Sequence, residues 1–482
     1  MKKIIWIFII FPMLLTAQES KKFKKRVLES AEIDILSSYY TQSGNNAAVT
    51  GGIGNEDLQD VATNINVSIP VNADDVLTID ATVSAYTSAS SSNLNPFTGA
   101  SSGEDDDDDD DRPSYTKRAA SQPITGSPWV ASSGASKSDV WLNATLGYSH
   151  SSDSRNTIIA SHLSVSNEFD YFSLGGGLNW TQLFNKKNTE IGLGINVYLD
   201  HWRPVYPTEI KTYIANGGNL NADFFQGVNI YNQSGFVIDK NSANAWKPQT
   251  DKFISNKARN TYTASISFSQ ILSKNMQISI FSDLTYQSGQ LANPMQRVYF
   301  KDKPNFYIGN PSDIQRYTSP DNTQVFQLAD AYEQLPETRL KIPVGVRLHY
   351  FITDFLVLRT YYRYYFDDWD LFSHTVNIEL PIKLSDKFTL IPDYRYYIQT
   401  QAKYFAPYNQ HLSSQTFYTS DYDLSAYSSN QFGIGLRYSD ALMDMKLWKL
   451  GIKNINLNYH FYDRTTGLKA QIVSLGMSLS LE

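Results

Sequence analysis

Hydrophobic and polar residues alternate with a period of two along most of the chain from Ile33 onward, in segments of roughly ten to fourteen residues. The alternation is clearest at the end of the chain, where Val473, Leu475, Met477, Leu479 and Leu481 are separated by serine or glycine. Such a pattern places one face of a β-strand in an apolar medium and the other face in a polar one. Strands of soluble sandwiches average about 5–6 residues, whereas a tilted membrane-spanning strand needs about 9–11. The lengths therefore favour a transmembrane barrel over a soluble β-sandwich.

Sixteen segments carry this pattern, which predicts an all-β fold: a transmembrane, antiparallel, up-and-down β-barrel of about 16 strands with long extracellular loops. The segments are 33–43, 60–70, 76–86, 139–149, 156–167, 171–184, 190–200, 260–271, 275–287, 338–351, 355–366, 372–382, 388–401, 430–439, 453–463 and 470–481.

The connections between these segments test the count. In an outer-membrane barrel one end has short periplasmic turns and the other has longer extracellular loops. Every connection longer than fifteen residues falls on one side when the amino end is periplasmic, and the only long turn on the other side is 440–452. The long loops are 44–59, 87–138, 201–259, 288–337 and 402–429. If the count were wrong by an odd number of strands, the long loops would fall on both sides of the membrane.

The first residues have the form of a secretory signal. Met1–Lys3 is basic, an apolar run of about a dozen residues follows, and Thr16-Ala17 supplies small residues before Gln18. The run is shorter than the roughly 20 residues of a spanning helix. We predict a signal peptide over 1–17 with cleavage after Ala17, a short basic periplasmic segment over 18–32, and an outer-membrane barrel over 33–482. The chain contains no cysteine, which excludes a lipoprotein anchor, disulfides and thiolate metal sites.

Composition agrees with export to a membrane. Charged residues make up only 18% of the chain, and mean hydropathy is −0.35 in spite of 32 Tyr and 25 Phe. Aromatic residues gather near the ends of the segments, where barrels place their interfacial girdles. The net charge of −7 argues against nucleic acid as a partner. The expected partners are outer-membrane lipid and a small solute, or a periplasmic or surface protein; no pattern indicates the oligomeric state.

Several motifs resemble a family of outer-membrane barrels known only as a domain of unknown function. They include Gly44–Glu56 (GNNAAVTGGIGNE), Tyr361–Asp370 (YYRYYFDDWD), Asp393–Tyr397 (DYRYY) and Tyr418–Ser425 (YTSDYDLS). The resemblance spans most of the predicted mature chain, with its sharpest motifs near the start and in the last third. It implies an outer-membrane barrel and no established reaction.

The alternation also predicts which side chains face the lumen. Leu356, Leu358 and Tyr362 mark the outward face of 355–366, which leaves the intervening residues inward. The resulting basic and aromatic wall contains Arg339, Arg347, Arg359, Tyr361, Arg363, Tyr365, Asp393, Arg395, Tyr397 and Arg437, with Lys341 and Glu379 nearby. Earlier strands offer Ser, Thr, Asn and Gly, so the other wall is predicted to be small and neutral. Arginine-lined pores favour anions, while a ladder of arginine contacts that stiffens the barrel is the structural alternative.

Two features of the 87–138 loop have weaker chemical meaning. Glu104–Asp111 is a run of eight acids, but it lacks the spaced ligands of an ordered calcium loop, and like charges favour a solvated segment. Ser133–Ser136 (SGAS) resembles the acceptor motif for covalent flavin, in which Ser136 would carry the phosphate. Val130 stands where that motif has Asp. We therefore predict an ordinary linker, no cofactor and no metal site.

No catalytic motif is present. The seven histidines lack metal-ligand spacing, and the chain has neither GxSxG nor a phosphate-binding glycine loop. His349 is the histidine best placed for the lumen, while His374 lies on the outward register. We expect no enzymatic activity.

The pattern leaves four functional hypotheses. The first is a channel or transporter for a small, possibly anionic solute. The second is a structural or partner-binding barrel that acts through the aromatic loops 201–259 and 288–337. The third is a redox role through a flavin at Ser136, and the fourth is a barrel hydrolase.

Overall fold

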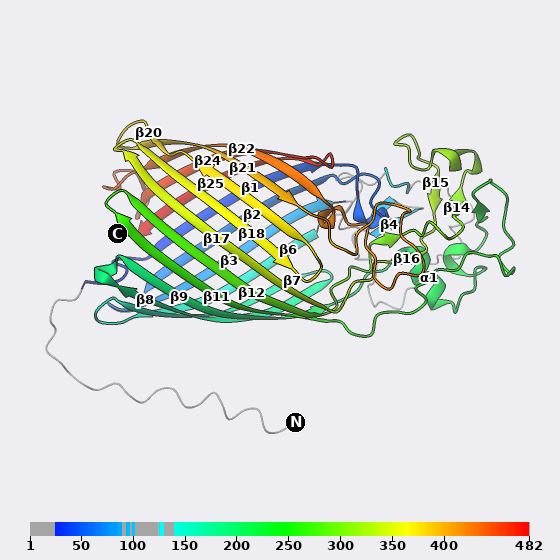
Figure 1. Cartoon of the computed structure of the whole chain (residues 1–482), viewed down its shortest axis with the longest axis horizontal. Helices are drawn as coiled ribbons and strands as arrows, with labels where there is room; N and C mark the ends of the chain where they lie inside the picture. Colours follow the sequence, from blue (N-terminus) through cyan, green and yellow to red (C-terminus); the bar gives the residue numbers. More distant parts are fainter. Residues whose placement is uncertain are drawn as a thin grey trace, which may run out of the picture.

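Sixteen long antiparallel strands pair with their neighbours in chain order, and the last strand closes on the first (Figure 1). The computed structural model describes residues 25–88, 93–96, 99–101, 124, 126–129 and 139–481. The barrel strands are β1 Glu32–Ser43, β2 Leu58–Pro70, β3 Asp75–Ser88, β6 Asp139–Ser151, β7 Thr157–Glu168, β8 Tyr171–Phe184, β9 Thr189–Trp202, β11 Ala258–Ser273, β12 Met276–Gly289, β17 Thr338–Thr353, β18 Leu356–Asp367, β19 Phe372–Glu379, β21 Phe388–Gln399, β22 Tyr427–Ser439, β24 Leu450–Arg464 and β25 Lys469–Leu481.

The ring is closed by a continuous ladder between β1 and β25, which runs from the pair Glu32 and Ser480 to the pair Ser43 and Lys469. Closure leaves no unpaired sheet edge, which is what a strand protein in lipid requires. The predicted fold and the predicted count of sixteen are confirmed.

One predicted segment, 372–382, is broken in the structure. β19 ends at Glu379 and the short β20, Ile382–Lys383, continues it after Leu380 and Pro381. Proline has no N–H to donate to a ladder, so the strand is interrupted there. β22 also begins at Tyr427, three residues before the predicted start.

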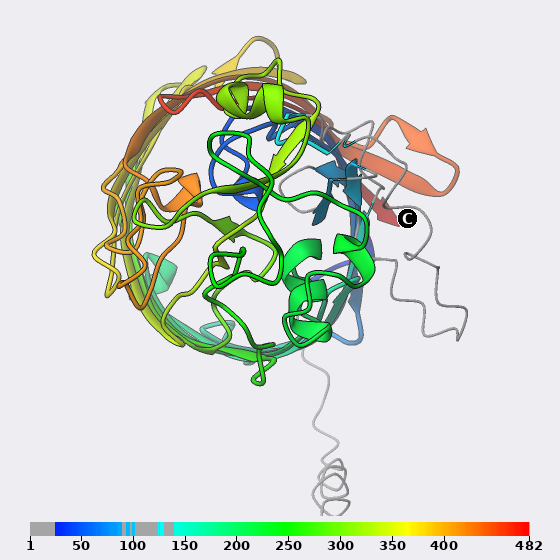
Figure 2. The same cartoon turned by 90° about the vertical axis from the view of Figure 1, so that its right-hand side faces the viewer.

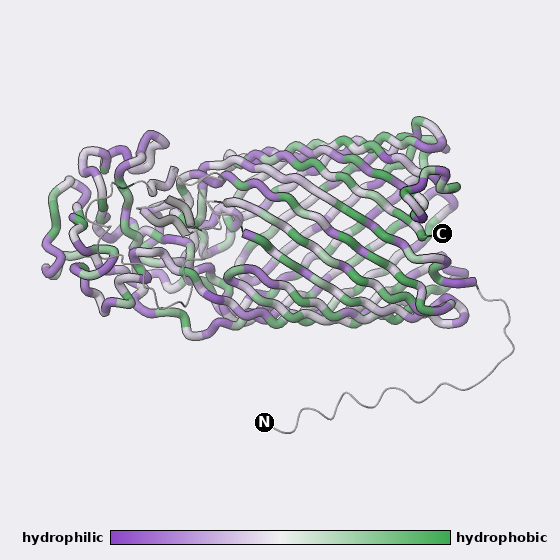
Figure 3. Tube along the Cα trace, turned by 180° about the vertical axis from the view of Figure 1, so that it is seen from behind, coloured by the Kyte–Doolittle hydropathy of each residue, from purple (hydrophilic) through white to green (hydrophobic). Residues whose placement is uncertain are grey.

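The two faces of the barrel differ as the alternation predicts. Large apolar side chains on the outside are solvent-accessible, in a belt that includes Leu146, Leu163, Leu178, Ile195, Ile266, Phe432, Leu457 and Leu475. A continuous apolar belt of this extent has no place on a soluble surface, so the barrel spans a membrane. Figure 3 shows the hydrophobic positions repeating along the strands. No helix within the described ranges combines the length and apolarity needed to cross a bilayer.

The long loops build a folded cap at one end of the barrel. The cap contains the helix α1 Thr208–Ala215, the sheet of β10 Tyr231–Asn232, β14 Phe306–Gly309 and β15 Val325–Gln327, and the pair β13 Arg297–Val298 with β16 Ala331–Tyr332. The short strands β4 Asn93–Asn95 and β5 Gly99–Ser101 form a further pair, and the 3-10 turns are η1 Ala48–Thr50, η3 Asn185–Lys187, η4 Asp223–Phe225, η5 Pro311–Arg316 and η6 Tyr422–Leu424. All of these turns except η3 belong to the long loops.

The cap has its own hydrophobic core. Trp246, Phe225, Ile210, Phe326 and Leu328 are fully buried within one cluster, and Trp246 donates its indole N–H to the Ala329 carbonyl at 3.1 Å. Segments of the cap cross the mouth of the ring (Figure 2). The described parts of the long loops therefore form an ordered structure over the mouth.

The opposite end carries the short turns and the first described residues. The backbone N–H of Val27 donates to Ala73, and Arg155 donates to the Lys25 carbonyl at 2.7 Å. The end with short turns is the periplasmic end of an outer-membrane barrel. The signal segment 1–17, the acidic run 104–111 and Ser136 lie outside the described residues.

Candidate functional site

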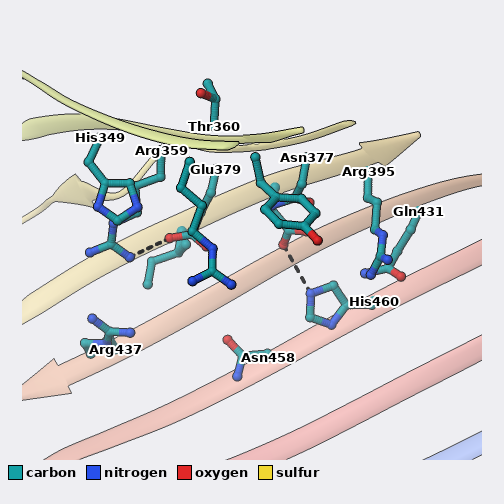
Figure 4. A pocket seen from close by; sticks show the side chains of 14 residues that line it. His349, Arg359, Thr360, Asn377, Glu379, Arg395, Gln431, Arg437, Asn458 and His460 are labelled. Atoms are coloured by element: carbon teal, nitrogen blue, oxygen red, sulfur yellow. Dashed lines mark hydrogen bonds and ion pairs between the residues drawn. The ribbon is translucent and has the colours of Figure 1, made fainter. Parts of the chain in front are cut away.

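A cavity of about 710 Å³ lies in the lumen against the strands from β17 to β24 (Figure 4). Its lining is strongly polar and contains four arginines, two histidines and two carboxylates. The lining residues are Arg347, His349, Arg359, Thr360, Tyr361, Asn377, Glu379, Ile391, Asp393, Arg395, Gln431, Arg437, Asn458 and His460. Thr360 lies on the far side of its strand from the others in Figure 4, as its place between Arg359 and Tyr361 requires.

The register of the ladder brings these side chains together. Arg359 is opposite Glu379 across β18 and β19, and Asn377 is opposite Arg395 across β19 and β21. Residues directly opposite in an antiparallel pair have Cβ atoms about 4.5–5.5 Å apart. The cavity wall is thus assembled from cross-strand neighbours of one face.

Glycine permits one of these contacts. Gly433 separates Asp393 from His460 in the ladder. A Cβ at Gly433 would lie 1.9 Å from the Asp393 carboxylate. Without that atom, Asp393 and His460 meet above Gly433, with Oδ2 and Nε2 3.2 Å apart.

The positive charges of the cavity are only partly compensated. Arg359 forms an ion pair with Glu379, with 2.6 Å between Nη1 and Oε1, and the carboxylate of Asp393 faces His460. Arg437 donates to the Asn456 amide oxygen at 2.6 Å. Among the described residues, no carboxylate pairs with Arg347 or Arg395. The cavity wall therefore carries more positive than negative charge.

Aromatic rings hold Arg347 in place. Its guanidinium carbon lies 4.9 Å from the centre of the Phe281 ring and 5.6 Å from that of Tyr361. The two rings stack with centroids 6.0 Å apart, and Phe281 occupies the space above Gly345, where a Cβ would approach within 2.2 Å of it. Such contacts fix the guanidinium without neutralising its charge.

The structure divides the predicted basic and aromatic wall between levels of the lumen. Arg347, Arg359, Tyr361, Asp393, Arg395 and Arg437 line the 710 Å³ cavity. Arg363, Tyr365 and Tyr397 share the inward register of their strands but lie nearer the cap. Tyr365 donates to Asp367 at 2.7 Å and Tyr397 donates to Gln399 at 2.6 Å.

Arg339 belongs to a second cavity of about 470 Å³ at the mouth, between the barrel and the cap. Its side chain forms an ion pair with Asp367 and lies 4.2 Å from the Trp369 ring. This cavity is also lined by Lys341 and Arg259 from the barrel and by Glu333 and Asp421 from the cap. This second cavity therefore contains both positively and negatively charged side chains.

Sequence reasoning missed part of the cavity. Asn377, Gln431, Asn458 and His460 line it, and the alternation in their strands contained the signal, because each is inward when its apolar neighbours are outward. His349 does line the cavity. His374 lies on the outward face, where its Nδ1 is 2.8 Å from the Tyr362 hydroxyl.

The prediction of a small and neutral opposite wall was wrong. Asp60 on β2 and Asp80 on β3 have the inward register, and so does Asp283 on β12, the strand next to β17. Asp80 accepts hydrogen bonds from Asn64 and Asn66 at 3.1 and 3.2 Å, and Asp60 accepts one from Ser84 at 2.5 Å. Neutral donors satisfy the carboxylates of Asp60 and Asp80 and leave their charge in place. The lumen therefore has an arginine wall facing a wall that contains aspartates.

The sequence matches the family described as "Protein of unknown function (DUF3570)" over residues 9–467. No curated protein is significantly similar to it in sequence.

Among solved structures, the chain is similar to a "Bacterial polysaccharide outer membrane secretin", with 9% identity and a TM-score of 0.41, covering 94% of this chain and 99% of that one. It is also similar to the toluene transporter TodX of Pseudomonas putida, with 8% identity and a TM-score of 0.35, covering 94% and 90%. A third similar structure is a loop-deletion mutant of OmpT, an outer membrane protein of Vibrio cholerae, with 8% identity and a TM-score of 0.34, covering 93% and 100%.

Proposed function

This chain belongs to the DUF3570 family, and we propose that it is an outer-membrane pathway for a small anionic solute that moves along the arginine wall. The observation that carries the proposal is the 710 Å³ lumenal cavity, in which four arginines outnumber two carboxylates. Arg347 and Arg395 contribute most, because both are solvent-exposed in the lumen and no described carboxylate pairs with either.

The physical basis is local charge in a hydrated lumen. Arginine presents a planar array of donors that matches carboxylate and phosphate oxygens. Arg347 is held by rings, so little side-chain entropy is lost when an anion binds. The aspartates of the facing wall repel an anion toward the arginines, so they define its path without blocking it.

A selectivity measurement tests this proposal. We expect Arg347→Gln combined with Arg395→Gln to lower the anion-to-cation permeability ratio in planar bilayers. Weakening an anion's interaction by ~1 kcal/mol corresponds to roughly a fivefold change. The matched control is Lys186→Gln with Lys187→Gln, which removes two positive charges at the periplasmic turn η3 and should leave the ratio nearly unchanged.

We also propose that the chain reaches the outer membrane by signal-dependent export with cleavage after Ala17. The apolar run of the first seventeen residues and the membrane-spanning barrel support this route. Intact mass measurement of the protein from outer membranes should give a chain that starts at Gln18. A mass that retains Met1–Ala17 would refute cleavage.

A second function, recognition of a surface partner, is favoured by the cap. Its loops have a buried core and a defined surface, which flexible tethers lack. A stable complex that forms with the purified cap-bearing barrel, combined with no conductance, would replace the pathway proposal by this one.

A further inference from the structure

The turn between β22 and β24 is longer than every other described connection at the periplasmic end. It spans 440–449 and contains the short strand β23, Lys446–Leu447, which pairs back on the beginning of β24. In Figure 2 this orange-red hairpin projects sideways, outside the ring of the barrel. It points toward the space that lipid occupies.

Several side chains of the hairpin are apolar and unusually exposed. Trp448 is 95% exposed and Leu442 is 82% exposed, while Leu447 and Met445 are about half exposed at 52% and 47%. A tryptophan and a leucine left this open lose the free energy of burial that large apolar groups normally gain. Contact with an apolar medium would stabilise these exposed side chains.

The backbone conformation at the tip of the hairpin is unfavourable for tryptophan. Trp448 has a φ of 58°, in the left-handed region that glycine or asparagine usually occupies in a tight turn. A bulky residue in this conformation costs of order 1 kcal/mol or more. A turn selected only for connecting two strands would not place its largest apolar residue at this position.

Side-chain contacts fix the position of the hairpin relative to the barrel. Lys387, in the neighbouring periplasmic turn, donates to Asp440 at 3.2 Å and to Asp444 at 3.1 Å. Tyr438 donates to Asp440 at 2.9 Å. The exposed Phe388 and Leu384 lie on the adjoining rim, so the hairpin continues the edge of the apolar belt.

We propose that the 440–449 hairpin inserts Leu442, Leu447 and Trp448 into the periplasmic leaflet, at the boundary between headgroups and acyl chains. Tryptophan favours this interface because it combines a large apolar ring with one N–H donor. Lys449 follows the apolar tip and matches the phosphates of phospholipid headgroups. The occupant is thus a lipid surface, and the function is to hold the barrel at a fixed height and rotation beside its lipids.

The absence of cysteine from the chain allows a direct test. A single Leu447→Cys variant keeps Trp448, and a nitroxide attached there reports depth through its relative accessibility to oxygen and to a water-soluble nickel chelate. The protein is refolded in vesicles of phosphatidylethanolamine and phosphatidylglycerol. Lys274→Cys, in the short turn between β11 and β12, is the matched water-exposed control.

We expect oxygen to be favoured over the nickel chelate at position 447 and the reverse at position 274. Equal nickel accessibility at both positions, in a protein that shows the heat-modifiable gel mobility of a folded barrel, would overturn the proposal. It would leave a periplasmic protein as the occupant.

The native tryptophan gives an independent readout. Brominated phospholipids should quench more of the fluorescence of the wild-type protein than of Trp448→Phe, because the remaining tryptophans are common to both. Identical fractional quenching of the two proteins would contradict insertion of Trp448. Neither readout depends on conductance, so a failed pathway proposal would leave this inference standing.

Discussion

Arg297 and Glu209 form a two-point ion pair inside the cap with both side chains completely excluded from solvent. Nε donates to Oε1 at 2.8 Å and Nη2 donates to Oε2 at 2.9 Å. Arg297 also donates to the Val49 carbonyl at 3.1 Å. Through this pair, helix α1, strand β13 and the first long loop are joined in one structure.

Breaking that pair from one side should loosen the cap. Glu209→Gln leaves a buried guanidinium without its carboxylate, which costs about 3–5 kcal/mol. The double variant Glu209→Gln, Arg297→Met should lose less than the sum of the two single variants, because no unpaired charge remains buried. Hydrogen exchange of cap peptides is measured by mass spectrometry, with barrel peptides as the internal control. It gives the stability of the cap in the wild type, the two single variants and the double variant. Additive losses would show that the two residues do not act as a pair.

The cap should be most stable at mildly acidic pH. Burial, together with the nearby charge of Asp421, raises the pKa of Glu333 from 4.5 to about 8. The folded cap therefore holds a proton that the opened cap releases, and its free energy of opening falls as pH rises from about 4.5 to about 8. Rates of limited proteolysis of the cap should increase over this window, after correction for the protease's own pH profile.

The variant Glu333→Gln should flatten that dependence and stabilise the cap at pH 8 by an amount on the order of 1–3 kcal/mol. Glu337→Gln, an exposed glutamate in the same loop, is the control. A pH dependence that survives in Glu333→Gln would assign the effect to other groups, such as Asp330.

Removing a carboxylate from the cavity should change the ion selectivity in the opposite direction to removing an arginine. Glu379→Gln releases Arg359 from its 2.6 Å ion pair and should raise the anion-to-cation permeability ratio by about twofold to fivefold. The comparison is with Asp354→Asn, which removes one acid at a periplasmic turn. A lower ratio in Glu379→Gln would show that the arginine wall supports the barrel and does not guide solute.

The barrel was predictable from the sequence because its side chains alternate between two environments along each strand. A strand with lipid on one side and water on the other must alternate, so segments such as 190–200 and 470–481 reveal both their boundaries and their inward faces. The break at Leu380 and Pro381 was also open to prediction, since proline disrupts a ladder. The aspartate wall was overlooked although Asp80 lies on the polar face of an alternating segment.

The cap was not predictable in the same way. Its loops have no period, and the pair of Arg297 with Glu209 joins residues 88 positions apart. Aromatic content indicated that loops 201–259 and 288–337 were more than tethers, but not which residues would meet. Contact between Asp393 and His460 likewise depends on Gly433, a relation visible only once three strands are in register.

The measurement that bears most directly on the central claim is the reversal potential of single channels across a salt gradient. It should be made with the wild-type protein and with the Arg347→Gln, Arg395→Gln double variant in planar bilayers. We predict anion-selective steps for the wild type and a shift toward cations in the double variant, where the aspartates of the facing wall are no longer balanced. A wild-type channel that prefers cations, or the same selectivity in both proteins, would contradict a path for anions along the arginine wall.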